Sequence, residues 1–128
     1  MSVLVLGSTG FIGKSLIKRL EKEPVEVTGV SRTTGVDLLD YNQVSDCIAS
    51  VRPDVIYNVA SHGGSLHYVK KYAASVYSDN LQMGLNLYRA LVENNSAAKI
   101  VQPFSNCSYP GNSSVQNEEN WLNGGVHP

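Results

Sequence analysis

Residues 7–13 have the composition and the setting of a turn that binds phosphate groups. They read GSTGFIG and lie between an apolar run at residues 3–6, typical of a strand buried on both faces, and a segment of helical periodicity. Gly7 would permit a tight turn, Gly10 would let the backbone approach a pyrophosphate, and Gly13 would let the helix pack closely. The start of that helix would offer unpaired N–H groups and the positive end of its dipole. The pattern predicts a dinucleotide site, although glycines also serve turns that bind nothing.

A second candidate group follows the next predicted strand, roughly twenty residues after the glycines, where the adenosine ribose of a dinucleotide is expected. Ser31 and Arg32 stand there, and the first acidic residue after them is Asp37. A guanidinium with a hydroxyl favours the 2′-phosphate of NADP, whereas an acid at this place would favour NAD. We therefore expect NADP, with NAD as the alternative. A solvated arginine in a loop remains the other interpretation of Arg32.

The elements that must position these residues alternate along the chain. Apolar runs predict strands at residues 3–6, 25–30, 55–60 and 99–104. Helical spacing predicts a first helix at residues 11–20. A second helix follows an N-cap box formed by Asp40 and Gln43, and its apolar residues are Val44, Cys47, Ile48 and Val51. A third, longer helix carries the apolar residues Leu81, Leu85, Tyr88, Leu91 and Val92. This rhythm predicts an α/β fold, a Rossmann-type doubly wound parallel sheet of about four strands. Pro103 is unexpected within a central strand and would mark its end.

Composition narrows the class of protein. The 128 residues are 42% hydrophobic and 16% charged, with a net charge of −1, which excludes bulk attraction to nucleic acid or to an anionic membrane. No apolar run approaches the roughly 20 residues of a membrane span, and the first residues lack the basic start that is typical of a signal peptide. Cys47 and Cys107 are too far apart for a CxxC pair, and His62 and His67 match no metal signature. We expect a cytoplasmic protein without a metal, in which His62 either reaches a substrate or makes a local hydrogen bond.

The G-x-x-G-x-x-G spacing, with the sequence around it, resembles the extended short-chain dehydrogenase/reductases, that is, the NAD(P)-dependent epimerase/dehydratase family. Within that family, the chain resembles the GDP-L-fucose synthase-like epimerase/reductases. The resemblance rests on a Ser-x-Cys-x-Tyr-Pro segment at residues 105–110, on Gly63-Gly64, and on Tyr77 with Asn80-Leu81. It covers nearly the whole chain.

The resemblance implies a chemistry at the carbonyl of a nucleotide-linked keto-sugar. Ser105 would hydrogen-bond the C4 oxygen during hydride transfer, and Cys107 would be the acid/base that moves a proton α to the carbonyl. The alternative for Ser105 is an ordinary loop hydroxyl, and the alternative for Cys107 is a small buried apolar residue. The implied coenzyme contacts, together with those above, are Gly7, Ser8, Thr9, Gly10, Phe11, Ile12, Gly13, Ser31, Arg32, Asp37, Leu38, Ala60 and Ser61.

The resemblance also implies a nucleotide-sugar substrate, with a GDP-sugar favoured, and a homodimer that uses a helix near residues 76–94. Asn80 matches a position that the family uses structurally or for relay, but a plain surface asparagine is equally compatible.

The sequence departs from the family at one motif. No tyrosine is followed by lysine four residues later, although the family's reaction uses a Tyr-x-x-x-Lys pair. We therefore expect residues 1–104 to be an NAD(P)-binding Rossmann domain and residues 105–128 to be an active-site loop, with the substrate-binding C-terminal region lacking and no turnover by this chain alone. A non-catalytic dinucleotide-binding module or sensor is the alternative. A flavodoxin-like domain shares the rhythm but does not predict this glycine spacing.

Overall fold

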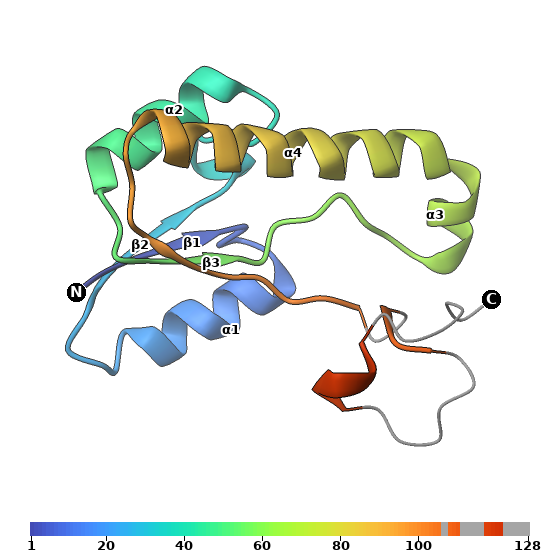
Figure 1. The fold of residues 1–128 in the computed structure, drawn as a ribbon, viewed down its shortest axis with the longest axis horizontal. Coiled ribbons are helices and arrows are strands. Elements are labelled where there is room, and N and C mark those ends of the chain that lie inside the picture. Colours follow the sequence, from blue (N-terminus) through green and yellow to red (C-terminus); the bar gives the residue numbers. More distant parts are fainter. Residues whose placement is uncertain (106–107, 111–116, 122–128) are drawn as a thin grey trace.

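The computed structural model describes residues 1–105, 108–110 and 117–121. Four parallel strands, β1 (Ser2–Leu6), β2 (Glu26–Val30), β3 (Val55–Asn58) and β4 (Lys99–Val101), form one sheet in the order β2-β1-β3-β4. The helices are α1 (Phe11–Leu20), α2 (Tyr41–Val51), α3 (Leu66–Lys71) and α4 (Ala73–Glu93), with short 3₁₀ helices η1 (Arg32–Thr34) and η3 (Glu118–Asn120). Helices α2 and α4 lie over one face of the sheet and α1 lies under the other (Figure 1). The predicted doubly wound α/β fold is confirmed.

The strand order creates a crevice at one edge of the sheet. Strand β1 pairs with β2 on one side and with β3 on the other, so the chain leaves the centre of the sheet in opposite directions. In doubly wound folds, ligands bind outside the carboxyl ends of the strands at such a switch point. The expected place for a ligand is therefore beside the ends of β1 and β3.

The main hydrophobic core lies between the sheet and the layer formed by α2 and α4. Its buried residues come from three strands, the segment before α2, and both helices: Leu4, Leu6, Val30, Leu38, Val44, Ile48, Ile56, Leu87, Ala90 and Leu91. Cys47 and Val51 pack against this cluster, which confirms the predicted apolar face of α2. Cys47 is half-buried, and this burial raises the pKa of its thiol, so the structure gives it a packing role.

Strands β3 and β4 are shorter than the sequence pattern predicts. Strand β3 ends at Asn58 because its partner β1 ends at Leu6 and turns away, leaving Val59 a last hydrogen bond to the Leu6 carbonyl. Strand β4 ends at Val101, so Pro103 lies beyond the ladder and removes no hydrogen bond from it.

Helix α3 was not predicted from the sequence. It contributes no buried residue, so hydrophobic periodicity, the main signal for a helix, does not mark it. Its local signal is Ser65, whose side chain caps the helix by accepting a hydrogen bond from the Tyr68 N–H.

The cap of α2 is only partly as predicted. The Asp40 carboxylate accepts from the N–H groups of Asn42 and Gln43, as an N-cap should. The Gln43 side chain donates to the Asp40 carboxylate but accepts from the Asp37 N–H rather than from that of Asp40. Gln43 thus ties the preceding loop to α2 instead of closing the box.

Helix α4 exposes most of the apolar residues that define its periodicity. Leu91 is buried as expected, but Leu81, Leu85, Tyr88 and Val92 are exposed. The other buried positions of α4 are Asn86, Leu87 and Ala90. Among the described residues, no helix combines the length and the apolar character needed to cross a bilayer.

Helix α1 lies directly against the turn that precedes it. A Cβ atom on Gly13 would lie 2.2 Å from the Gly7 carbonyl oxygen and 2.8 Å from the Ser8 Cα. Both obstacles are backbone atoms, so neither could move aside without shifting the turn or the helix.

Replacement of Gly13 by alanine should lower the free energy of unfolding by about 2–3 kcal/mol, because the added methyl group overlaps the turn. The matched control is Gly84→Ala in α4, where a Cβ meets nothing within 4 Å. That control should raise stability by up to about 1 kcal/mol through helix propensity. Urea unfolding monitored by circular dichroism measures both, and a Gly13→Ala variant as stable as the wild type would contradict the packing described.

Candidate functional site

A pocket of about 900 Å³ opens at the carboxyl edge of the sheet. Three chain segments line it: the glycine turn and start of α1 at residues 7–12, the segment 31–39 after β2, and the loop 59–64 after β3. Side chains of α3 and α4 complete the wall through Tyr68, Asp79 and Met83. The pocket therefore occupies the switch point that the strand order predicts. A second pocket of about 440 Å³ at the opposite edge contains none of the residues predicted to bind a coenzyme.

The glycine turn is held between β2 and β3. The N–H groups of Gly7 and Ser8 both donate to the Val30 carbonyl, at 2.9 and 3.0 Å, and Gly10 N–H donates to the Gly7 carbonyl at 3.0 Å. Gly7 has a φ of 81°, and a Cβ there would lie 2.8 Å from the Cα of Ala60. Both features require glycine. The turn therefore brings the ends of β1, β2 and β3 within contact distance.

The start of α1 faces the pocket without a side-chain cap. Gly10 is the N-cap and offers no side-chain hydrogen bond, and the first turn of the helix has no acidic residue. The first N–H groups of a helix have no partner within the helix, and the dipole makes this end positive. Gly10, Phe11 and Ile12 all line the pocket. The arrangement suits a phosphate group.

A cluster of hydroxyl groups joins the glycine turn to the end of β2. Thr9 Oγ1 donates to Ser31 Oγ at 3.1 Å and accepts from Thr33 Oγ1 at 3.2 Å. Ser31 also contacts Thr34 of η1: its Oγ lies 3.2 Å from Thr34 Oγ1, and its N–H donates to that same oxygen at 2.7 Å. Arg32 is the first residue of η1, is exposed, and lines the pocket. These hydroxyls set the position of the loop that carries the guanidinium.

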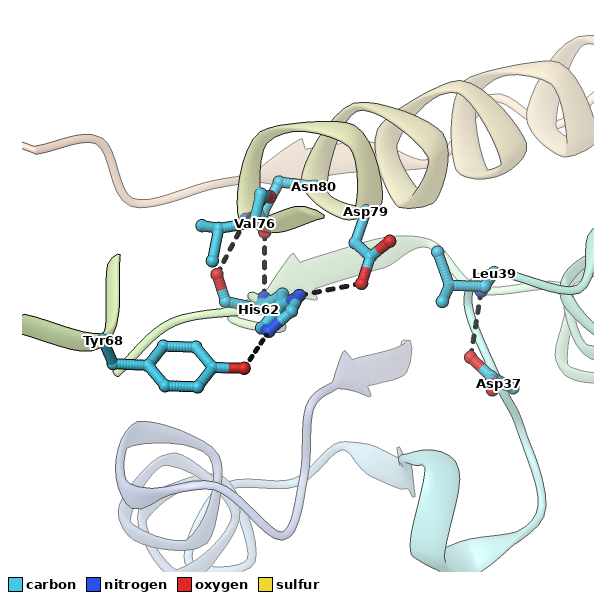
Figure 2. A network of polar contacts seen from close by, with 7 residues as sticks. All are labelled: Asp37, Leu39, His62, Tyr68, Val76, Asp79 and Asn80. Carbon is cyan, nitrogen blue, oxygen red and sulfur yellow. Dashed lines mark hydrogen bonds and ion pairs between the residues drawn. The ribbon is translucent and has the colours of Figure 1, made fainter. Parts of the chain in front are cut away.

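Asp37 and Leu38 are shared between the pocket wall and the fold. The Asp37 carboxylate accepts from the Leu39 N–H at 3.0 Å (Figure 2). Leu38 lines the pocket but is buried within the core, and its carbonyl accepts a hydrogen bond from Asn86 at 2.9 Å. The wall at this point is therefore fixed before any ligand binds.

The loop after β3 is clamped to α3 and α4 through His62 (Figure 2). The His62 N–H donates to Asn80 Oδ1 at 2.9 Å, and Asn80 Nδ2 donates to the His62 carbonyl at 2.8 Å. The His62 ring lies 2.8 Å from Asp79 Oδ2 through Nδ1 and 2.9 Å from the Tyr68 hydroxyl through Nε2. The sequence is compatible with a structural or relay role for Asn80 and with a plain surface position, and the geometry gives it a structural role. No motif in the sequence links Tyr68 and Asp79 to His62, so neither is predicted from it.

Most residues predicted to bind a coenzyme lie around this pocket. Of the thirteen, all line it except Ser8, which is buried within the turn, and Gly13, which packs against the backbone of the turn. Ser105, predicted to be catalytic, is exposed after β4 and is not part of the pocket lining, and Cys107 lies outside the described residues. Across the ranges that the structure describes, no three His, Cys, Asp or Glu side chains group as metal ligands do.

Comparisons with known proteins agree with this geometry. GDP-L-colitose synthase of Yersinia pseudotuberculosis is 28% identical over 111 residues, covering 86% of this chain and 35% of that protein. GDP-L-fucose synthase of Escherichia coli is 30% identical over 109 residues, covering 84% of this chain and 33% of that protein. The structure of MlghC, a GDP-mannoheptose C4 reductase from Campylobacter jejuni with NADP bound, superposes with a TM-score of 0.80 at 23% identity, covering 98% of this chain and 37% of that one.

The chain spans about a third of the length of the curated relatives that it matches. Residues 3–128, nearly all of it, match the model of a single family. The glycine turn, the switch-point pocket and this match lead to one conclusion: the chain belongs to the NAD dependent epimerase/dehydratase family.

Proposed function

We propose that the chain is the coenzyme-binding part of an enzyme that transfers hydride between NADP and a keto-sugar linked to a nucleotide. The observation that carries the proposal is the uncapped start of α1, which opens into a pocket at the switch point of the sheet. In this proposal residues 1–104 bind the coenzyme and residues 105–128 form the active-site loop.

The residues that line the pocket would hold the three parts of an extended coenzyme. The N–H groups at the start of α1 would hold the pyrophosphate, because the helix dipole there favours negative charge. Ser31 and Arg32, at the end of β2, would hold the adenosine ribose. The backbone of Ala60 and Ser61, in the loop after β3, would hold the nicotinamide half.

The preference for NADP over NAD rests on charge at the end of β2. Arg32 lines the pocket there, and a guanidinium can bind a 2′-phosphate with two parallel hydrogen bonds. The first carboxylate after it, that of Asp37, already accepts a hydrogen bond from the Leu39 N–H. NADP is also the coenzyme bound in the C. jejuni reductase of the same fold.

The substrate proposal rests on the relatives and on residues after β4. Both curated relatives above have names that refer to GDP-sugars, so a GDP-sugar is the substrate class we propose. Ser105 would donate a hydrogen bond to the C4 oxygen while hydride passes to or from C4, and Cys107 would move the proton α to that carbonyl. NADP when bound supplies the hydride chemistry, and the protein supplies orientation and charge.

Isothermal titration calorimetry tests the coenzyme proposal. NADPH should bind the wild-type chain at least tenfold more tightly than NADH, because only NADPH carries the 2′-phosphate. Arg32→Ala should weaken NADPH binding by about tenfold or more and leave NADH binding nearly unchanged. Arg19→Ala, on an exposed arginine of α1, is the control and should change neither. Tighter binding of NADH by the wild type would show that the role given to Arg32 is wrong.

The exposed stripe of α4 supports a second proposal, that two copies of the chain pair through this helix. The stripe consists of apolar and aromatic side chains that recur every three or four residues. Their exposed fractions range from 49% to 76%, and they are Tyr77, Leu81, Leu85, Tyr88 and Val92. Such a stripe lies on one helix face, and an apolar face of this kind marks an interaction surface.

Sedimentation velocity should therefore find a dimer for the wild type at micromolar concentration, because the stripe is exposed in the single chain and pairing would bury it. Leu85→Glu places a charge at the centre of the stripe and should give a monomer with an unchanged circular dichroism spectrum. Lys18→Glu, at an exposed position of α1, is the control and should remain a dimer. A monomeric wild type would exclude this use of α4.

A further inference from the structure

The side chains of Asp79, His62 and Tyr68 form a hydrogen-bonded chain that ends at the pocket. Asp79 Oδ2 lies 2.8 Å from His62 Nδ1, and His62 Nε2 lies 2.9 Å from the Tyr68 hydroxyl (Figure 2). The three residues come from α4, the loop after β3 and α3, and all three line the pocket.

The chemistry of the three groups fixes the direction of the hydrogen bonds. An ionised carboxylate only accepts, so the proton between Asp79 and His62 must belong to Nδ1 of the ring. In the neutral imidazole Nε2 then has no proton and accepts one from the Tyr68 hydroxyl. The proton of Tyr68 therefore points to His62, and the lone pairs of its oxygen remain for the pocket.

The backbone of the loop is also held by hydrogen bonds that do not involve this chain of side chains. Asn80 holds both the N–H and the carbonyl of His62, and it also bonds the Val76 carbonyl within its own helix. Replacement of Tyr68 should therefore remove the hydroxyl, and replacement of Asp79 should change the direction in which that hydroxyl donates its hydrogen bond. Both changes should leave the loop backbone in place.

The Tyr68 ring packs against Gly64 of the loop. A Cβ on Gly64 would lie 2.8 Å from Tyr68 Cδ1 and 3.0 Å from Cγ, so only glycine leaves this room. The ring also contacts Tyr72, with centroids 4.9 Å apart, on the side toward α4. The hydroxyl is thus held by packing as well as by its hydrogen bond to His62.

These residues lie at the β3 side of the pocket, away from the Ser31–Arg32 end. Strands β2 and β3 flank β1 on opposite sides, and the glycine turn that follows β1 separates the two ends. A dinucleotide whose adenosine ribose lies at the end of β2 places its other half beside the loop after β3.

We propose that Tyr68 binds the nicotinamide half of the coenzyme by accepting a hydrogen bond from a donor there, and that Asp79 and His62 are positioning residues that fix the polarity of its hydroxyl. The inference rests on the proposed function. The donor is an N–H of the carboxamide or a hydroxyl of the adjacent ribose, which are the hydrogen-bond donors that this half of the coenzyme carries.

The binding test compares NADPH with 2′,5′-ADP, which has the adenosine half only. Tyr68→Phe should weaken NADPH binding by about five- to tenfold, the effect of one hydrogen bond, and change 2′,5′-ADP binding by less than twofold. Asp79→Asn should act similarly, because the amide can donate to Nδ1, reverse the ring tautomer and turn the hydroxyl proton toward the ligand's donor. The double variant should bind NADPH no worse than the weaker single variant, since both remove the same interaction. Tyr72→Phe, on the neighbouring ring outside the pocket lining, is the control and should bind both ligands normally.

An analogue of NADPH with a 3-acetylpyridine ring, which lacks the amide donor, identifies the group that Tyr68 binds. If Tyr68→Phe still weakens the analogue, the ribose is the donor, and if it does not, the carboxamide is. Both results support the proposal.

A second measurement determines the direction of the hydrogen bonds between Asp79, His62 and Tyr68 without a ligand. Nitrogen-15 NMR of the histidine rings should find the proton of His62 on Nδ1 in the wild type and on Nε2 in Asp79→Asn. Equal NADPH binding by Tyr68→Phe and wild type, or an Nε2 proton on neutral wild-type His62, would overturn the inference.

If neither NADPH nor 2′,5′-ADP binds the wild type, the proposed function fails and the ligand assigned to Tyr68 fails with it. If 2′,5′-ADP and NADPH both bind while Tyr68→Phe has no effect, the inference alone fails.

Discussion

The contact between α1 and the turn before it is the constraint on which the pocket depends. Gly13 lets the helix approach the Gly7 carbonyl, and Gly7 lets the turn approach Ala60 at the end of β3. A side chain at either glycine would separate the helix start from the ends of the strands. Since phosphate binding uses the N–H groups and the dipole at that helix start, the function proposed here follows from a packing condition at two residues.

The two ends of the pocket are organised by different interactions. At the β2 end, neutral hydroxyls of Thr9, Ser31 and Thr33 join two loops around an exposed guanidinium, which suits recognition of a phosphate charge. At the β3 end, His62 and Asp79 orient a single hydroxyl through a chain of hydrogen bonds, which suits recognition of a neutral group. One fold thus offers charge at one end of an extended ligand and hydrogen-bond direction at the other.

The sequence predicts the parts of this structure that depend on local order. Spacing alone predicts the glycine turn, the start of α1 and the core face of α2, because each is formed by residues that are close together in the sequence. The chain Asp79–His62–Tyr68 could not be predicted, since it joins residues up to 17 positions apart through a loop whose path only the folded structure fixes. The partner of Gln43 was likewise not predictable from the sequence. Its side chain accepts a hydrogen bond from the Asp37 N–H in the preceding loop, whereas the N-cap box predicts the Asp40 N–H.

The most direct test of the account is a titration of the nitrogen-15-labelled chain with NADPH, followed through the backbone amide signals. The N–H groups of Phe11 and Ile12, which line the pocket at the uncapped start of α1, should shift strongly and saturably, because they are the ones that would bind the pyrophosphate. Signals from Arg52 and Asp54, at the opposite edge of the sheet, should remain in place. Saturable shifts that leave Phe11 and Ile12 unchanged would contradict the account.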